Sequence, residues 1–109
     1  MSKSDMSNLS VLDLQVLWQI SLKPIHAYSL LKVLGEKRGK KITSGALFPV
    51  LKKFKDRKYI KARKAGKREK IVYGITAKGR DALKGSCNDF VELFDDIFKK
   101  YGCIKCEAK

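Results

Sequence analysis

The chain of 109 residues is 44% hydrophobic and 33% charged, and its 25 Lys and Arg against 11 Asp and Glu give a net charge of +14. This length suits one domain and leaves no room for two, and this composition excludes a disordered tail. The N-terminal residues lack the apolar run of a signal peptide, and no stretch approaches the roughly 20 apolar residues of a membrane span. We therefore expect a folded cytoplasmic protein with no membrane partner.

The positive charge is concentrated in the middle of the chain. Residues 35–70 carry 15 basic and 3 acidic side chains, a net of +12, whereas the other 73 residues carry a net of +2. A diffuse excess would indicate only solubility, but a local block indicates a surface for a polyanion. A solvated lysine-rich face is the alternative interpretation.

Residues 10–22 are predicted to form the first helix. Ser10 and Asp13 fit the capping-box pattern that precedes an apolar run. Apolar side chains surround this segment almost completely, so it must be covered on more than one side. The domain core can cover one side, and the other needs a partner from elsewhere in the chain or from a second subunit.

Two more helices are predicted at 25–38, where Gly35 or Gly39 is the expected stop, and at 43–58, so that together they form a helix-turn-helix. In the second of these, four apolar residues share one stripe, at the positions Leu47, Val50, Leu51 and Phe54. The opposite side has small residues near the start of the helix and cationic residues further along, which suits close approach to a DNA groove. Thr43 or Ser44 is the expected N-cap, and the free N–H groups of the first turn suit a phosphate. Pro49 lies near enough to the start for the helix to continue through it.

Alternating residues then predict a hairpin of two strands, with Ile60 and Ala62 inward and Lys61 and Arg63 outward in the first strand. The glycine turn between the strands carries a basic tip, made of Lys64, Lys67, Arg68 and Lys70. A basic hairpin directly after a helix-turn-helix is typical of a winged helix, whose wing touches phosphates or the minor groove.

A long final helix is predicted from about residue 77 to 101, with Thr76 as its N-cap. A heptad-like seam along it predicts a dimer interface, made of Leu83, Cys87, Phe90, Phe94, Ile97 and Tyr101. The alternative is that this helix folds back on its own domain. The expected fold is mainly α with a β-hairpin wing, a winged helix-turn-helix, plus a long C-terminal dimerisation helix. Residues 1–75 would form the DNA-binding domain, 76–102 the dimerisation helix of the same compact unit, and 103–109 a cysteine-containing tail.

Several short motifs occur in a recognisable order: His26-Ala-Tyr28, then Gly45-Ala-Leu-Phe-Pro-Val-Leu51, a tyrosine-containing wing strand, and Thr76-Ala-Lys-Gly79. Over about residues 9–85 the chain resembles PadR-type transcriptional regulators, of the small subtype. The resemblance implies a winged-helix homodimer that binds operator DNA, a third helix that continues through Pro49, and Tyr28 close to the DNA. The family usually has glycine where this chain has Ala27 and tyrosine where it has Phe48, so a phosphate hydrogen bond from that hydroxyl is absent here.

From the residues and the resemblance together we predict a homodimer that binds a two-half-site operator in double-stranded DNA. The predicted DNA-binding residues are Tyr28, Thr43, Ser44, Gly45, Lys52, Lys53, Lys55, Lys64, Lys67, Arg68 and Lys70. Lysine rather than arginine dominates the basic block, which favours point-charge contacts with phosphates over bidentate reading of bases. An architectural DNA-binding protein with little sequence specificity is therefore the alternative function.

Other sites receive less support from the sequence. His26 is the only histidine, no nucleophile has a histidine beside it, and no phosphate-binding glycine loop occurs, so we expect neither an enzyme nor a cofactor. Cys103 and Cys106 form one CxxC pair, with an inert tail, a disulfide and a zinc site as the open interpretations. Trp18 is expected to fill the interior; the alternative is an aromatic effector pocket formed with Phe94 or Phe98 at the dimer interface.

Overall fold

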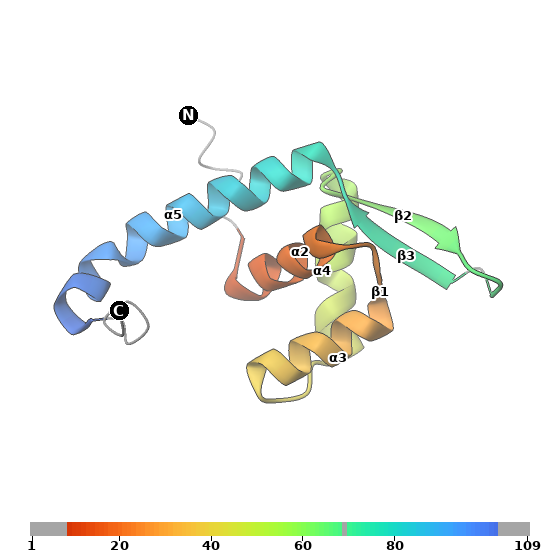
Figure 1. The fold of residues 1–109 in the computed structure, drawn as a ribbon, viewed down its shortest axis with the longest axis horizontal. Coiled ribbons are helices and arrows are strands. Elements are labelled where there is room, and N and C mark those ends of the chain that lie inside the picture. The colour runs from red at the N-terminus through yellow and green to blue at the C-terminus, as the bar shows by residue number, and fades with distance from the viewer. Residues whose placement is uncertain (1–8, 69, 103–109) are drawn as a thin grey trace.

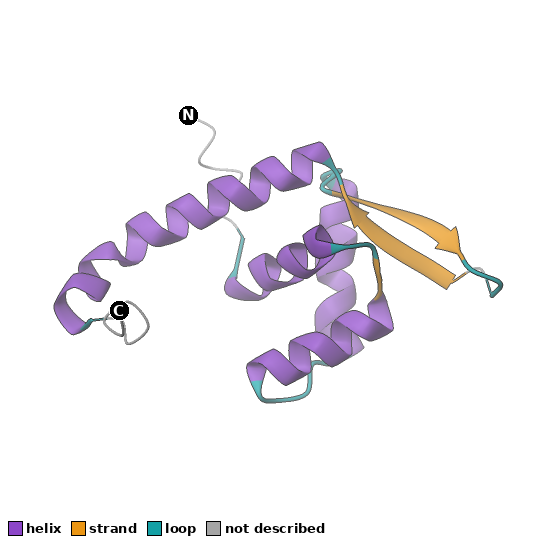
Figure 2. Cartoon of the chain, viewed as in Figure 1, coloured by secondary structure: helices purple, strands orange, loops and turns teal. Residues whose placement is uncertain are grey.

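The computed structural model describes residues 9–68 and 70–102, so Cys103 and Cys106 lie outside the described residues. The elements, labelled as in Figure 1, are α2 (Val11–Leu22), β1 (Ile25–His26), α3 (Ala27–Arg38), α4 (Ser44–Asp56), β2 (Ile60–Ala65), β3 (Lys70–Ile75) and α5 (Ala77–Tyr101). The strands gather at one end of the molecule, and the long α5 leaves it on the other side (Figure 2). None of the helices in the described part is both long and apolar enough to cross a membrane.

Helix α2 begins where the capping pattern predicted. The Ser10 side chain accepts a hydrogen bond from the backbone N–H of Asp13, and the Asp13 carboxylate accepts one from the N–H of Ser10. One side of the helix enters the core, where Leu17 is fully buried. Trp18 is 50% exposed, so the expectation that it fills the interior is wrong. Within the described residues, the side of α2 that faces away from the core is therefore covered only in part.

The predicted start of the second helix was wrong, because residues 25 and 26 are not helical. They form the short strand β1, which pairs antiparallel with β3 in a sheet of order β1-β3-β2, with Ile25 opposite Tyr73 and His26 opposite Val72. A two-residue strand is too short to show alternation, and its partner lies far along the chain. Helix α3 therefore begins at Ala27 and ends at Gly39, whose φ of 72° suits glycine.

Helix α4 has Thr43 as its N-cap and continues through Pro49, as predicted. The predicted stripe, formed by Leu47, Val50, Leu51 and Phe54, is buried in the core. Pro49 cannot donate a hydrogen bond to the carbonyl of Gly45 four residues earlier. Both residues lie on the exposed side of α4, where water can satisfy that carbonyl.

The hairpin of β2 and β3 projects from the helical body as a wing (Figure 1). Its register places Ile60 opposite Ile75 at the base and Ala65 opposite Lys70 near the tip. Ile60 is buried, but Ala62, which was expected to point inward, is exposed because the strand has already passed beyond the core at that point. Most of the wing is therefore accessible to a partner.

Helix α5 starts on the core and then extends away from it. The Thr76 side chain accepts a hydrogen bond from the N–H of Gly79 and donates one to the carbonyl oxygen of Lys58 at 2.7 Å. Ala82 and Ser86 are buried on the body of the domain, whereas the later turns extend beyond the other helices (Figure 1). The alternative, in which the whole helix folds back on its own domain, is not observed.

Gly79 allows the close approach of α5 to the end of α4 and the start of the wing. A Cβ atom at this position would lie 2.1 Å from the Tyr59 carbonyl oxygen, which is backbone and cannot rotate away. We expect Gly79→Ala to lower the free energy of unfolding by about 1–3 kcal/mol, as other overpacked sites do, in urea denaturation. Gly74→Ala is the matched control, because nothing lies within 4 Å of its added Cβ; equal losses for both variants would refute this packing.

A buried ion pair joins α2 to α4. The Asp13 carboxylate is almost fully buried and accepts a hydrogen bond from the ammonium group of Lys53. Lys53→Met would leave this buried carboxylate without its counter-charge, so we expect a loss of about 1–3 kcal/mol of unfolding free energy.

Lys52→Met is the control for that change, because Lys52 pairs with Asp56 at the surface, where both side chains are mostly exposed. It should change the unfolding free energy by less than about 0.5 kcal/mol. Similar denaturation midpoints for the two variants would contradict the structural role of Lys53.

Candidate nucleic-acid interface

The exposed side of α4 begins with small polar residues. Thr43, Ser44 and Gly45 are all exposed, and the Thr43 hydroxyl oxygen accepts a hydrogen bond from the N–H of Ala46 at 3.2 Å. The N–H groups of Ser44 and Gly45 precede the first intrahelical hydrogen bond and can bind an anion. The start of α4 therefore offers backbone hydrogen-bond donors that no bulky side chain blocks.

The lysines of α4 divide between its two sides. Lys52 and Lys55 are exposed, and the Lys52 ammonium lies 3.2 Å from the Asp56 carboxylate in a surface pair that a competing phosphate can replace. Lys53 is turned into the domain toward Asp13. Lys53 was predicted to bind DNA, and the structure gives it a partner within the domain. Helical spacing places it between the buried and the exposed sides, and the acidic partner on α2 could not be seen in the sequence.

The wing presents cations along its length as well as at its tip. The predicted residues Lys64, Lys67, Arg68 and Lys70 are exposed. Lys61 and Arg63 are exposed too, and alternation along β2 places them on the sheet face opposite to Lys64. The sequence predicted that these two side chains point outward, but they were not among the predicted DNA-binding residues.

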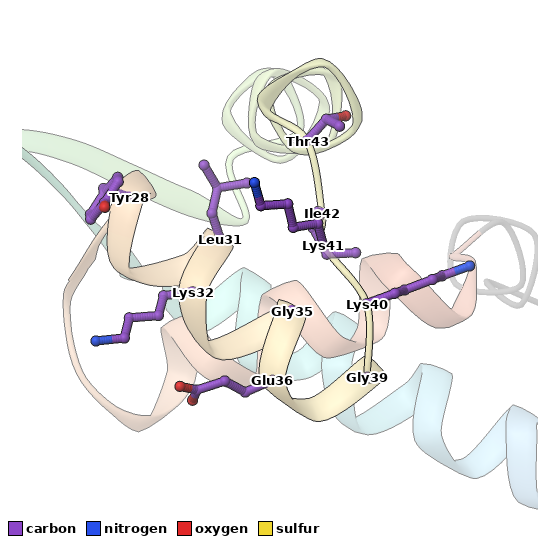
Figure 3. Close-up of a pocket in the computed structure, with 10 residues that line it drawn as sticks. All are labelled: Tyr28, Leu31, Lys32, Gly35, Glu36, Gly39, Lys40, Lys41, Ile42 and Thr43. Atoms are coloured by element: carbon purple, nitrogen blue, oxygen red, sulfur yellow. The ribbon is translucent and has the colours of Figure 1, made fainter.

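A hollow of about 740 Å³ lies between α3 and the loop that leads to α4 (Figure 3). Tyr28, 80% exposed at the start of α3, lines one end, and Thr43 at the N-cap of α4 lines the other. Lys32, Lys40 and Lys41 also line it. All three were missed, although the run of basic residues around 37–41 was a signal for Lys40 and Lys41. The basic surface thus continues from α4 across the helix-turn-helix.

A second hollow, of about 410 Å³, separates α4 from the wing strand β3. Leu51 and Tyr73, which are both almost fully buried, form its floor. Phe48 lines it together with the charged side chains of Lys52, Lys55 and Asp56. This places an aromatic ring beside cationic groups on the accessible side of α4.

An apolar groove of about 340 Å³ lies between α2 and α5, on other helices than the basic surface. Trp18 lines it with Leu83, Cys87, Phe90 and other side chains. The predicted partners of Trp18 in an effector pocket, Phe94 and Phe98, are not among its lining residues, because α5 has diverged from α2 by that point; Phe94 instead stacks on Phe90 with ring centroids 4.4 Å apart.

The predicted dimer seam has different surroundings along α5. Leu83 packs partly on its own core, and Phe90 and Phe94 are half-buried, whereas Ile97 and Tyr101 are exposed. Other exposed apolar residues extend this strip, namely Val91, Leu93 and Phe98. His26 occupies the N-cap position of α3, with Nδ1 at 3.1 Å from the Ile71 carbonyl oxygen.

Comparisons with solved structures find the same fold in several other proteins. A PadR-like transcriptional regulator from Bacillus cereus is 22% identical, with 85% of this chain and 93% of that chain covered and a TM-score of 0.74. A transcriptional regulator from Clostridium thermocellum is 20% identical (80% and 89% covered, TM-score 0.72), and RosR from H. salinarum is 18% identical (93% and 94% covered, TM-score 0.69). The winged-helix prediction is confirmed. A search of curated proteins finds no match.

The family evidence comes from the sequence itself. A profile described as "Transcriptional regulator PadR-like family" matches residues 16–85. This span runs from the middle of α2, through the helix-turn-helix and the wing, into the first turns of α5. Because the match covers more than half of the chain, the protein belongs to the PadR-like family of transcriptional regulators.

Proposed function

We propose that the protein binds operator DNA as a homodimer, with α4 in the major groove of each half-site and the wing on the flanking backbone. One observation carries this proposal: the exposed side of α4 lies between two other cationic surfaces, the wing and the α3–α4 loop. A duplex seated on α4 would meet phosphate-binding groups on both flanks. The buried side of the same helix fixes this orientation.

The surface for a second subunit is the outer half of α5. It exposes apolar side chains that no other element of the described chain covers, among them Leu93 and Tyr101, each 77% exposed. A second copy could cover this strip together with the exposed edge of α2, which includes Trp18. Two α4 helices held in this way should read half-sites roughly 34 Å apart, about one turn of DNA.

The groove beside Trp18 is the candidate effector site. Its lining is almost wholly apolar and includes the rings of Trp18 and Phe90, which suits a flat aromatic molecule. In a dimer, Phe94 and Phe98 could approach such a molecule from the second subunit. An effector bound there would act through the angle between α2 and α5.

Binding should depend strongly on salt and on the wing. If six to ten phosphates are neutralised, affinity should fall by about three to five orders of magnitude between 50 and 200 mM salt. Removing the two charges of the wing tip with Lys67→Ala and Arg68→Ala should weaken binding and reduce the slope of log affinity against log salt by about one for each lost contact. Fluorescence anisotropy with a labelled duplex measures both.

Lys84→Ala on α5 is the matched control, because Lys84 is exposed but lies outside the proposed DNA surface. Its salt slope should equal that of the unmodified protein. An equal reduction per removed charge for Lys84 and for the wing would show that total charge, rather than the wing, determines binding. Competition with random DNA tests the architectural alternative: a regulator retains at least one genomic fragment, whereas an architectural protein loses all fragments alike.

Dimer formation should depend on the apolar strip of α5. Ile97→Glu introduces a charge at a half-exposed apolar position and should give a monomer by native mass spectrometry, with weaker operator binding because both half-sites are no longer held together. Lys99→Glu places the same carboxylate on the polar side of α5, with a larger change in net charge, and should nevertheless remain dimeric. A dimeric Ile97→Glu protein would contradict this interface.

A further inference from the structure

The proposed DNA-reading helix has few groups that can distinguish base pairs by hydrogen bonding. From Ser44 to Asp56, α4 contains no Arg, Asn or Gln, so lysine is the only one of the common purine-contacting residues that it offers to the major groove. Its exposed lysines are point charges that suit phosphates as well as bases. Sequence discrimination by α4 would therefore gain from a contact that does not depend on hydrogen bonds.

Phe48 is an aromatic side chain placed on the accessible side of this helix. It is 48% exposed, although the neighbouring positions Leu47 and Leu51 are almost fully buried in the core. At 100° per residue, Phe48 shares its side of the helix with Ser44, one turn earlier, and Lys52, one turn later. The ring therefore lies in line with the residues that would face the groove.

The surroundings of Phe48 suit an apolar group flanked by phosphates. The ring lines the hollow between α4 and β3, whose floor is formed by Leu51 and Tyr73. Lys52, Lys55 and Asp56 line the same hollow, and because Asp56 pairs with Lys52, these three side chains keep a net positive charge. An apolar group with anions beside it fits this arrangement better than a hydrogen-bonding group does.

The apolar group that DNA displays on a base edge in the major groove is the 5-methyl group of thymine. We propose that Phe48 is a specificity-determining residue that contacts thymine methyl groups in the operator; this inference rests on the DNA-binding function proposed above. The contact buries apolar surface on both partners and is lost when cytosine or a purine replaces thymine. Each half-site should then contain thymine beneath the second turn of α4.

Removal of the methyl group tests the contact directly. A duplex retained from a random-sequence pool by the unmodified protein is synthesised again with deoxyuridine in place of thymidine, which keeps the Watson–Crick hydrogen bonds. We expect the unmodified protein to bind the deoxyuridine duplex about fourfold more weakly for each contacted methyl group. Phe48→Ser should bind both duplexes equally, and Phe48→Leu should retain part of the preference.

The outcomes separate this inference from the proposed function. No binding to any duplex would refute the DNA-binding function itself. Sequence-selective binding with equal affinity for the thymidine and deoxyuridine duplexes would leave that function in place and overturn the role of Phe48. A preference for thymidine that persists unchanged in Phe48→Ser would also overturn it, because the difference would then come from the shape of the DNA. Because Phe48 is half-exposed, circular dichroism should show both variants folded.

Discussion

The burial of one stripe of α4 determines which side of that helix can meet a partner. The four apolar residues of the stripe, Leu47, Val50, Leu51 and Phe54, belong to the core cluster. Because helical geometry ties the orientation of every residue to that of its neighbours, the small and cationic positions on the other side must face outward. The ion pair from Lys53 to Asp13 adds a directional contact, so the rotation of α4 is fixed by packing and by charge.

The two halves of helix α5 lie in different environments. Its first turns pack closely on the body through Gly79 and Ala82, whereas its last turns expose apolar side chains beyond the body. This division keeps the strip proposed for the second subunit away from α4 and the wing. Subunit contact and DNA contact therefore need not compete, and a change in the angle of α5 would alter the distance between two α4 helices.

Local patterns predicted most of the fold. Capping residues at Ser10, Thr43 and Thr76 and the apolar stripe of α4 are properties of consecutive residues, and each appears in the structure. Long-range contacts were not predictable in this way. Strand β1 exists only through its pairing with β3, and the inward turn of Lys53 depends on a carboxylate 40 residues away. The exposure of Trp18 was missed because its apolar character does not show whether the interior of its own domain or a second subunit covers it.

The proposed mode of DNA binding requires α4 to present its N-terminal turn and exposed side to DNA. A nuclear magnetic resonance titration of the labelled protein with an operator duplex tests this most directly, because each backbone amide reports its own environment. We expect the largest shifts at Ser44 and Gly45 and along the wing, with small shifts in the outer turns of α5. Shifts concentrated on α5, with the α4 amides unmoved by saturating DNA, would contradict it.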